Sequence, residues 1–190
     1  MTEQNSCGWP SGDPLMIRYH DEEWGIPLHH DQKLFEFMLL DAFQAGLNWK
    51  TILHKRENFR NAFDSFDVAK IAAYGEKDYE RLLIDARIIR NKAKIRGTIG
   101  NARCFLEVQK EFGTFDKYIW QFTGGKTISN HWTNLKQIPA SSKYSDAMSK
   151  DLKSRGFKFV GSTICYAFMQ AAGMINDHLV SCPQYKMCSG

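Results

Sequence analysis

Long hydrophobic runs are missing from this sequence. Its apolar runs, such as residues 37–40, are far shorter than the ~20 residues that a helix needs to cross a bilayer. The first ten residues carry acidic and polar side chains, whereas a secretory signal begins with positive charge and continues with an apolar stretch. We therefore expect a protein that has no membrane span, is not exported and remains in the cytoplasm.

Internal repeats and low-complexity segments are absent, and runs of alternating β-branched residues are scarce. Apolar residues instead recur at helical spacing along most of the chain, which predicts an all-α fold. The 190 residues suffice for one well-packed core and are too few for two separate domains, so we expect a single domain over residues 1–190, with two interleaved lobes as the alternative. Predicted helices cover residues 31–45 (capped by Asp31), 49–63, 67–74, 78–84, 91–112, 115–122, 146–154 and 162–172, with an exposed loop at 123–142 and a loose tail at 183–190.

The cysteine count is odd, at five, which argues against a disulfide framework. We expect thiols that are either reduced or bound to a metal. Cys104 and Cys165 lie in apolar helical patterns, where a free cysteine is usually a small buried hydrophobe.

A large excess of one charge is also lacking, because the net charge is only +4. That value fits a nucleic-acid binder with one basic face and equally fits many unrelated enzymes. The distribution is more informative: residues 86–106 contain six lysines and arginines and no acidic residue. This segment predicts a local positive patch.

Two pairs of candidate metal ligands stand at opposite ends of the chain. Cys7 and His20 form one pair, and His178 and Cys182 form the other. If residues 178–182 are helical, their i, i+4 spacing places both side chains on one face. Two thiolates and two imidazoles suit a tetrahedral zinc ion with no position left for water, hence a structural one. Spacing alone is a weak signal and favours two buried cysteines and two ordinary histidines over a metal site. Cys188 is a less favourable alternative to Cys182, because it lacks the helical register.

The run Pro-Cys-x-x-Cys, which a catalytic zinc deaminase requires, does not occur. A different set of motifs follows in order along nearly the whole chain. These motifs are residues 7–9 (Cys-Gly-Trp), 13–15 (Asp-Pro-Leu), 19–25 (Tyr-His-Asp-Glu-Glu-Trp-Gly), 44–49 (Gln-Ala-Gly-Leu-Asn-Trp), 55–59 (Lys-Arg-Glu-Asn-Phe), 88–91 (Ile-Ile-Arg-Asn), 155–161 (Arg-Gly-Phe-Lys-Phe-Val-Gly) and 176–178 (Asn-Asp-His). Together they resemble the DNA-3-methyladenine glycosylase I family.

The resemblance implies a fold, a cofactor and a partner. The fold is the helix-hairpin-helix DNA glycosylase fold, with the hairpin near residues 78–105 and its turn at 85–91. One structural zinc per chain would be held by Cys7, His20, His178 and Cys182, joining residues 7–20 to residues 178–182. The partner is alkylated double-stranded DNA, bound by a monomer. Phosphate contacts are expected from the hairpin turn with Arg90, Lys92 and Lys94.

The resemblance also implies an activity, the flipping and hydrolytic removal of 3-methyladenine in base excision repair. Aromatic faces favour a cationic base by ~1 to 2 kcal/mol when water is excluded. The residues expected to bind the base are Trp9, Met16, Tyr19, Asp41 and Trp49. Among them, Asp41 and Tyr19 are the catalytic candidates, and Trp49 is the expected stacking partner. Gly46 and Leu47 are expected at the turn that fills the gap left in the duplex.

Two of these positions depart from the family. Asp41 stands where the family has glutamate, one methylene longer, and Met16 where a close relative often has tyrosine. These changes leave room for a non-catalytic damage-recognition protein or a broader alkylpurine glycosylase on the same fold. A small-molecule purine enzyme is a third alternative, but it would leave the basic segment without a purpose.

Overall fold

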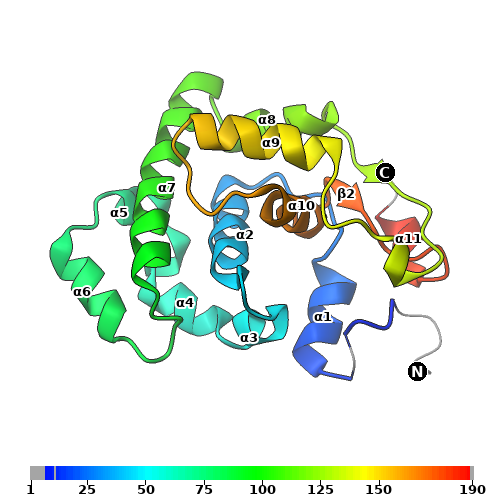
Figure 1. Ribbon diagram of the computed structural model, residues 1–190, viewed down its shortest axis with the longest axis horizontal. Coiled ribbons are helices and arrows are strands. Elements are labelled where there is room, and N and C mark those ends of the chain that lie inside the picture. Colours follow the sequence, from blue (N-terminus) through cyan, green and yellow to red (C-terminus); the bar gives the residue numbers. More distant parts are fainter. Residues whose placement is uncertain (1–6, 11, 189–190) are drawn as a thin grey trace.

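The computed structural model describes residues 7–10 and 12–188, and its centre is helix α2 (Asp31–Gln44) (Figure 1). Every residue of α2 from 34 to 43 is buried, so the helix is covered on all sides. The long helix α7 (Lys92–Phe112) and helix α10 (Ser162–Ala171) both pack against it. The centre of the molecule therefore consists of three helices that are far apart in the sequence.

The remaining helices surround this centre. Helices α5 and α6 lie beside α7 on one side of the molecule, while α1 and α11 lie on the opposite side (Figure 1). Their bounds are α1 (Pro14–Glu22), α3 (Trp49–His54), α4 (Arg56–Ala62), α5 (Val68–Ala72), α6 (Glu76–Ile84), α8 (Phe115–Trp120), α9 (Lys143–Ser154) and α11 (Pro183–Met187), with 3-10 turns η2 (Asp64–Phe66), η3 (Gln121–Thr123) and η4 (Leu135–Gln137).

The helical prediction is confirmed in its main lines and wrong in several details. The helix expected over 49–63 is divided at Lys55, where the backbone leaves the helical region between α3 and α4. Asp31 does not cap α2; its carboxylate accepts hydrogen bonds from the backbone N–H groups of Phe115 and Asp116 at the start of α8.

The loop expected at 123–142 and the tail expected at 183–190 both contain ordered structure. Strand β1 (Ile128–Ser129) pairs in parallel with β2 (Ile175–Asn176), a small exception to an all-α fold. Residues 183–187 form α11 instead of a loose tail, and Cys188 after it is buried. Residues 189–190 of that expected tail, and residues 1–6 of the segment searched for an export signal, lie outside the described residues.

Residues 178–182 are not helical, so the helical i, i+4 spacing considered for His178 and Cys182 does not apply. They follow β2 as an extended segment and a turn before α11. Any convergence of His178 and Cys182 therefore arises from this turn and not from i, i+4 spacing.

None of the described helices has the length and apolar character required to cross a membrane. This agrees with the absence of long apolar runs from the sequence.

Candidate functional site

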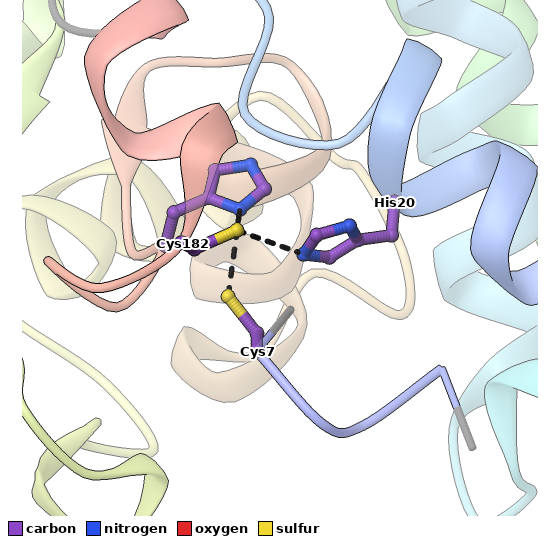
Figure 2. A group of neighbouring side chains, drawn as sticks. Cys7, His20 and Cys182 are labelled. Carbon is purple, nitrogen blue, oxygen red and sulfur yellow. Dashed lines mark hydrogen bonds between the residues drawn. The ribbon is translucent and has the colours of Figure 1, made fainter. Parts of the chain in front are cut away.

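The four predicted ligands come together in one buried cluster, here called the Cys/His cluster: Cys7, His20, His178 and Cys182. Figure 2 shows Cys182 facing His20 from α1 and Cys7 from the N-terminal segment. The ligand atoms of the four residues all lie within 4.8 Å of one another. Segments from the two ends of the chain thus meet at a single point.

The distances in the Cys/His cluster fit a tetrahedral metal. The Cys7 Sγ to His178 Nδ1 distance is 3.5 Å, and Cys182 Sγ lies 3.6 Å from His178 Nδ1 and 3.7 Å from His20 Nε2. Zinc bonds of ~2.3 Å to sulfur and ~2.1 Å to nitrogen, at tetrahedral angles, place S and N about 3.6 Å apart. The donor set and its spacing therefore fit a zinc ion with four protein ligands.

Hydrogen bonds outside the cluster fix both imidazole rings in the tautomer that a metal requires. His178 Nε2 donates to the Trp24 carbonyl oxygen at 2.9 Å, and His20 Nδ1 donates to the Asp21 carboxylate at 2.7 Å. Each ring therefore directs its unprotonated nitrogen toward the sulfur atoms. Such outer hydrogen bonds orient metal-binding histidines.

The two thiols of the cluster differ in their readiness to ionise. Hydrogen bonding from the Cys7 thiol is the largest influence on the Cys182 thiol and lowers its pKa to about 2. The hydrogen bond with Cys182, together with burial, raises the pKa of Cys7. One thiolate is thus favoured by the protein alone, and a cation would favour the second.

A cavity of about 380 Å³ lies next to the Cys/His cluster, and all five residues expected to bind the base line it. Tyr19 and Trp49 are in contact, with ring centroids 5.1 Å apart. The complete lining of this aromatic cavity is Trp9, Met16, Tyr19, Trp24, Asp41, Gln44, Trp49, Leu135, Ile138, Ala167 and Gln170.

The aromatic cavity holds polar atoms that the protein leaves without partners. Trp9 Nε1, Trp49 Nε1 and Asp41 Oδ2 are buried and have no hydrogen bond within the described part of the chain. A buried polar atom without a partner costs ~1 to 3 kcal/mol. Three such atoms around one cavity indicate a site built for a ligand with polar edges.

Burial controls the ionisation of the two catalytic candidates. Asp41 is 2% exposed, and burial raises the pKa of its carboxyl group well above the usual range. Burial, followed by the nearby charge of Asp41, raises the pKa of the Tyr19 hydroxyl well above 10. Tyr19 is therefore a neutral hydrogen-bond donor, whereas a cation in the cavity would favour ionised Asp41.

Two tryptophans separate the aromatic cavity from the Cys/His cluster. Trp9 and Trp24 line the cavity, and their rings also contact His20 at centroid distances of 5.2 and 6.0 Å. Trp24 lies 4.6 Å from the ring of His178 as well. The cluster therefore supports one wall of the cavity.

The chain turns sharply after α2, at the position expected to fill a gap in the duplex. Gly46 adopts a φ of +78°, which favours glycine, and the next residue, Leu47, is 43% exposed. An exposed leucine at a tight turn beside the cavity-lining residues Gln44 and Trp49 is a candidate wedge.

The structure corrects the expectation that Lys94 contacts phosphate. Lys94 is buried, and its Nζ donates to the backbone carbonyl oxygens of Phe43 at 2.7 Å and Ala45 at 2.6 Å. Sequence reasoning placed Lys94 with the basic patch because its neighbours are charged, but helical periodicity turns it toward α2. Lys94 therefore stabilises the C-terminal end of α2, directly before the Gly46–Leu47 turn.

Arg90 and Lys92 remain exposed, and neither forms an ion pair with another described residue. They flank Asn91, whose side chain caps α7 by accepting a hydrogen bond from the Lys94 backbone N–H at 3.0 Å. Two free cations beside a helix N-terminus form a surface that attracts anions.

Comparison with known proteins now identifies the family. Residues 9–185 match the family model described as methyladenine glycosylase. The chain belongs to the methyladenine glycosylase family. It is 52% identical over 179 residues to DNA-3-methyladenine glycosylase 1 of Escherichia coli (strain K12), covering 94% of this chain and 96% of that protein.

Solved structures of glycosylases share this fold. A crystal structure of 3-methyladenine DNA glycosylase I matches with 49% identity and a TM-score of 0.92, over 94% of this chain and 98% of the other. The Staphylococcus aureus 3-methyladenine DNA glycosylase I, described for its recognition of 3-methyladenine, matches with 32% identity and a TM-score of 0.93, over 97% of this chain and 98% of that one. The resemblance expected from the motifs is thus confirmed, and with it the assignment to an enzyme family.

Sequence reasoning missed part of the cavity in this methyladenine glycosylase family member. Trp24 and Gln44 lie inside motifs that carried the resemblance, so their proximity to other pocket residues was a usable signal. Leu135, Ile138 and Gln170 reach the cavity from segments more than a hundred residues away from α1. No local pattern marks those three positions.

Proposed function

We propose that this protein is a DNA-3-methyladenine glycosylase, which flips 3-methyladenine out of alkylated double-stranded DNA and hydrolyses its bond to deoxyribose in base excision repair. The observation that carries the proposal is the aromatic cavity with its unpartnered carboxylate oxygen at Asp41. Relatives with up to 52% identity are named for this activity, and one solved relative is described for recognition of 3-methyladenine.

The cavity favours a cationic purine over a neutral one. Methylation at N3 gives the adenine ring a positive charge, which is attracted to the faces of Trp49 and Tyr19. The same charge favours ionisation of Asp41, and the base then provides a partner for the carboxylate oxygen Oδ2, which has none among the described residues. Tyr19 and Asp41 are therefore proposed to bind the base edge while Trp9, Met16 and Trp49 enclose it.

The proposed reaction is hydrolysis of the bond between the base and deoxyribose. Water forms a bond to C1′ of deoxyribose, the C1′–N9 bond breaks, and its electron pair neutralises the departing base. The proton released from water passes to solvent, leaving an abasic site and neutral 3-methyladenine. Because the leaving group is already activated, the residues of this chain act by flipping, stacking and charge stabilisation.

DNA contacts are proposed at the two turns. The 85–91 turn between α6 and α7 is proposed as the hairpin of a helix-hairpin-helix unit, with Arg90 and Lys92 at phosphates. Leu47 at the Gly46 turn is proposed to occupy the gap left by the flipped base. These contacts position the duplex without reading its sequence.

The Cys/His cluster is proposed to hold one structural zinc ion. Its four buried donors, their spacing and the fixed histidine tautomers fit the ion. A bound zinc would join the two terminal segments beside the cavity wall. We also propose one glycosylase domain that acts as a cytoplasmic monomer. None of its described cysteines is in a disulfide, as a reducing compartment allows.

The test is release of modified bases from methylated duplex DNA, with 3-methyladenine and 7-methylguanine quantified separately by chromatography. We expect release of 3-methyladenine and its loss in Asp41→Ala, with Asp116→Ala, an aspartate on α8, as the matched control. Release of both bases would indicate the broader glycosylase that Met16 allows. Binding of DNA without release of either base would instead identify a non-catalytic recognition protein and overturn the proposal.

A further inference from the structure

Gln170 on α10 lines the aromatic cavity, and its side-chain amide is held in one orientation. The Nε2 atom donates a hydrogen bond to Asp177 Oδ2 at 2.7 Å. No donor among the described residues is hydrogen-bonded to the other polar atom of this amide, Oε1. Gln170 therefore offers an acceptor at a cavity where Trp9 Nε1, Trp49 Nε1 and Asp41 Oδ2 also have no partner among the described residues.

Asp177 determines which way the Gln170 amide faces. The Asp177 carboxylate is completely buried and accepts four hydrogen bonds, two at each oxygen. Oδ1 accepts from Asn130 Nδ2 at 2.7 Å and Trp132 Nε1 at 2.6 Å, while Oδ2 accepts from the Tyr166 hydroxyl at 2.7 Å and from Gln170. Because a carboxylate only accepts hydrogen bonds, the Gln170 NH₂ group must face Asp177.

Both residues of this arrangement belong to packed parts of the fold. Asp177 lies between strand β2 and His178 of the Cys/His cluster, and Gln170 lies on a helix that packs against α2. The orientation of the amide is thus fixed before any base enters, as a selective binding site requires.

The chemistry of purines gives this acceptor a selective use. In cationic 3-methyladenine, the exocyclic amino group at position 6 is the only conventional hydrogen-bond donor on the base, while N1 and N7 accept. Guanine derivatives carry an oxygen acceptor at position 6. A fixed carbonyl oxygen accepts a hydrogen bond from the amino group and repels the oxygen.

We propose that Gln170, oriented by Asp177, is a specificity-determining residue that accepts a hydrogen bond from the exocyclic amino group of the flipped base. This inference rests on the proposed function and adds a residue that selects adenine over guanine derivatives. Asp177 acts as a positioning residue, because it touches Gln170 and not the base.

The first test combines a change in the protein with a change in the base. Free 3-methyladenine and 3-methylpurine, which lacks the amino group, are titrated into the zinc-loaded protein and followed by tryptophan fluorescence. We expect Gln170→Leu to reduce the preference for 3-methyladenine about tenfold, as for one lost hydrogen bond. Gln109→Leu is the matched control, because Gln109 donates to Asp31 in the same way at 2.6 Å but does not line the cavity.

The second test reverses the amide without removing it. In Asp177→Asn, the new NH₂ group faces Gln170, so the Gln170 amide turns and presents a donor to the cavity. We expect the preference for the amino-bearing base to fall as far as in Gln170→Leu, and release of 3-methylguanine from methylated DNA to rise relative to 3-methyladenine. Zinc content and thermal unfolding are measured in parallel.

The outcomes separate this inference from the proposed function. A merely structural role for Gln170 and Asp177 lowers affinity for both bases alike and leaves the preference unchanged, which would overturn the inference. If Gln170→Leu binds neither base, the preference measured in Asp177→Asn decides. Failure of the unaltered protein to release 3-methyladenine would instead overturn the proposed function.

Discussion

The Cys/His cluster and the aromatic cavity are two buried regions that share the walls formed by Trp9 and Trp24. They differ in whether their buried polar atoms have hydrogen-bond partners. In the cluster, hydrogen bonds to Asp21 and Trp24 satisfy the outer nitrogens of both histidines. In the cavity, Asp41 Oδ2 and two indole N–H groups have no partner among the described residues. The satisfied region contributes stability, while the unsatisfied region retains a cost that a ligand can remove.

The difference predicts that stability and activity can be changed separately. Breaking the Cys/His cluster should affect folding first, because it joins both terminal segments of the described chain. Changing the cavity should affect ligand binding first, and some changes there should stabilise the free protein.

The largest expected effect follows from Cys182→Ala. Removing one of the four donors leaves the other three without a complete ligand set for the proposed zinc ion, so we expect the free energy of unfolding to fall by about 3 kcal/mol or more. Denaturant unfolding and metal content by mass spectrometry measure the effect. Cys104→Ala, at a half-buried cysteine outside the cluster, serves as control. Equal stability of the two variants would mean that the cluster does not hold the termini.

The next effect concerns Asp41→Asn, which keeps the size of the side chain and removes its charge. We expect release of 3-methyladenine to fall about a hundredfold, since a hydrogen bond between a charged acceptor and a cationic base contributes ~1.5 to 3 kcal/mol. Single-turnover kinetics on methylated DNA measure the loss. Unchanged kinetics would assign recognition of the charge to the aromatic rings alone.

The same variant should show an opposite effect on stability. Burial raises the folded-state pKa of Asp41 above its value near 4 in the unfolded chain, so its contribution to stability is complete at low pH and is lost as the pH rises toward the folded pKa. Asparagine does not ionise, so the Asp41→Asn variant does not lose this stability as the pH rises. Its free energy of unfolding should therefore rise relative to the unaltered protein by up to about 1.4 kcal/mol per pH unit above pH 4.

Urea unfolding of both proteins from pH 4.5 to pH 8 measures this difference. A constant difference across that range would show that Asp41 has the same pKa in the folded and unfolded states. Burial of Asp41 in the aromatic cavity would then carry no cost in stability, contrary to the contrast drawn with the Cys/His cluster.

The smallest effect extends the comparison to cations. Arg90→Ala and Lys92→Ala should each reduce by about one the slope of log binding constant against log salt for duplex DNA, because each removes one of the proposed phosphate contacts. Lys94→Met should leave this slope unchanged, since its ammonium group is bound to the α2 carbonyl oxygens. Fluorescence anisotropy at several salt concentrations distinguishes these variants. A reduced slope for Lys94→Met would mean that Lys94 contacts a DNA phosphate after all.

Much of the fold was predictable because helical periodicity is local. The C-terminal end of α6, the extent of α7 to within one residue and the turn between them follow from apolar spacing. The break at Lys55, the pairing of β1 with β2 and the order of α11 were not predictable, because each depends on contacts with distant segments. Asp31 illustrates the limit: its sequence context suggests a cap for α2, whereas the fold places α8 within its reach.

The sequence by itself determined the helical class, the family motifs and the residue types of both buried regions. Only the tertiary structure decided that the non-helical segment 178–182 brings His178 and Cys182 to Cys7, that Lys94 turns inward, and that Gln170 joins the aromatic cavity. The physical reason is that residue chemistry and helical period act over a few positions. Burial and hydrogen-bond partners, by contrast, are set by which distant segments pack together.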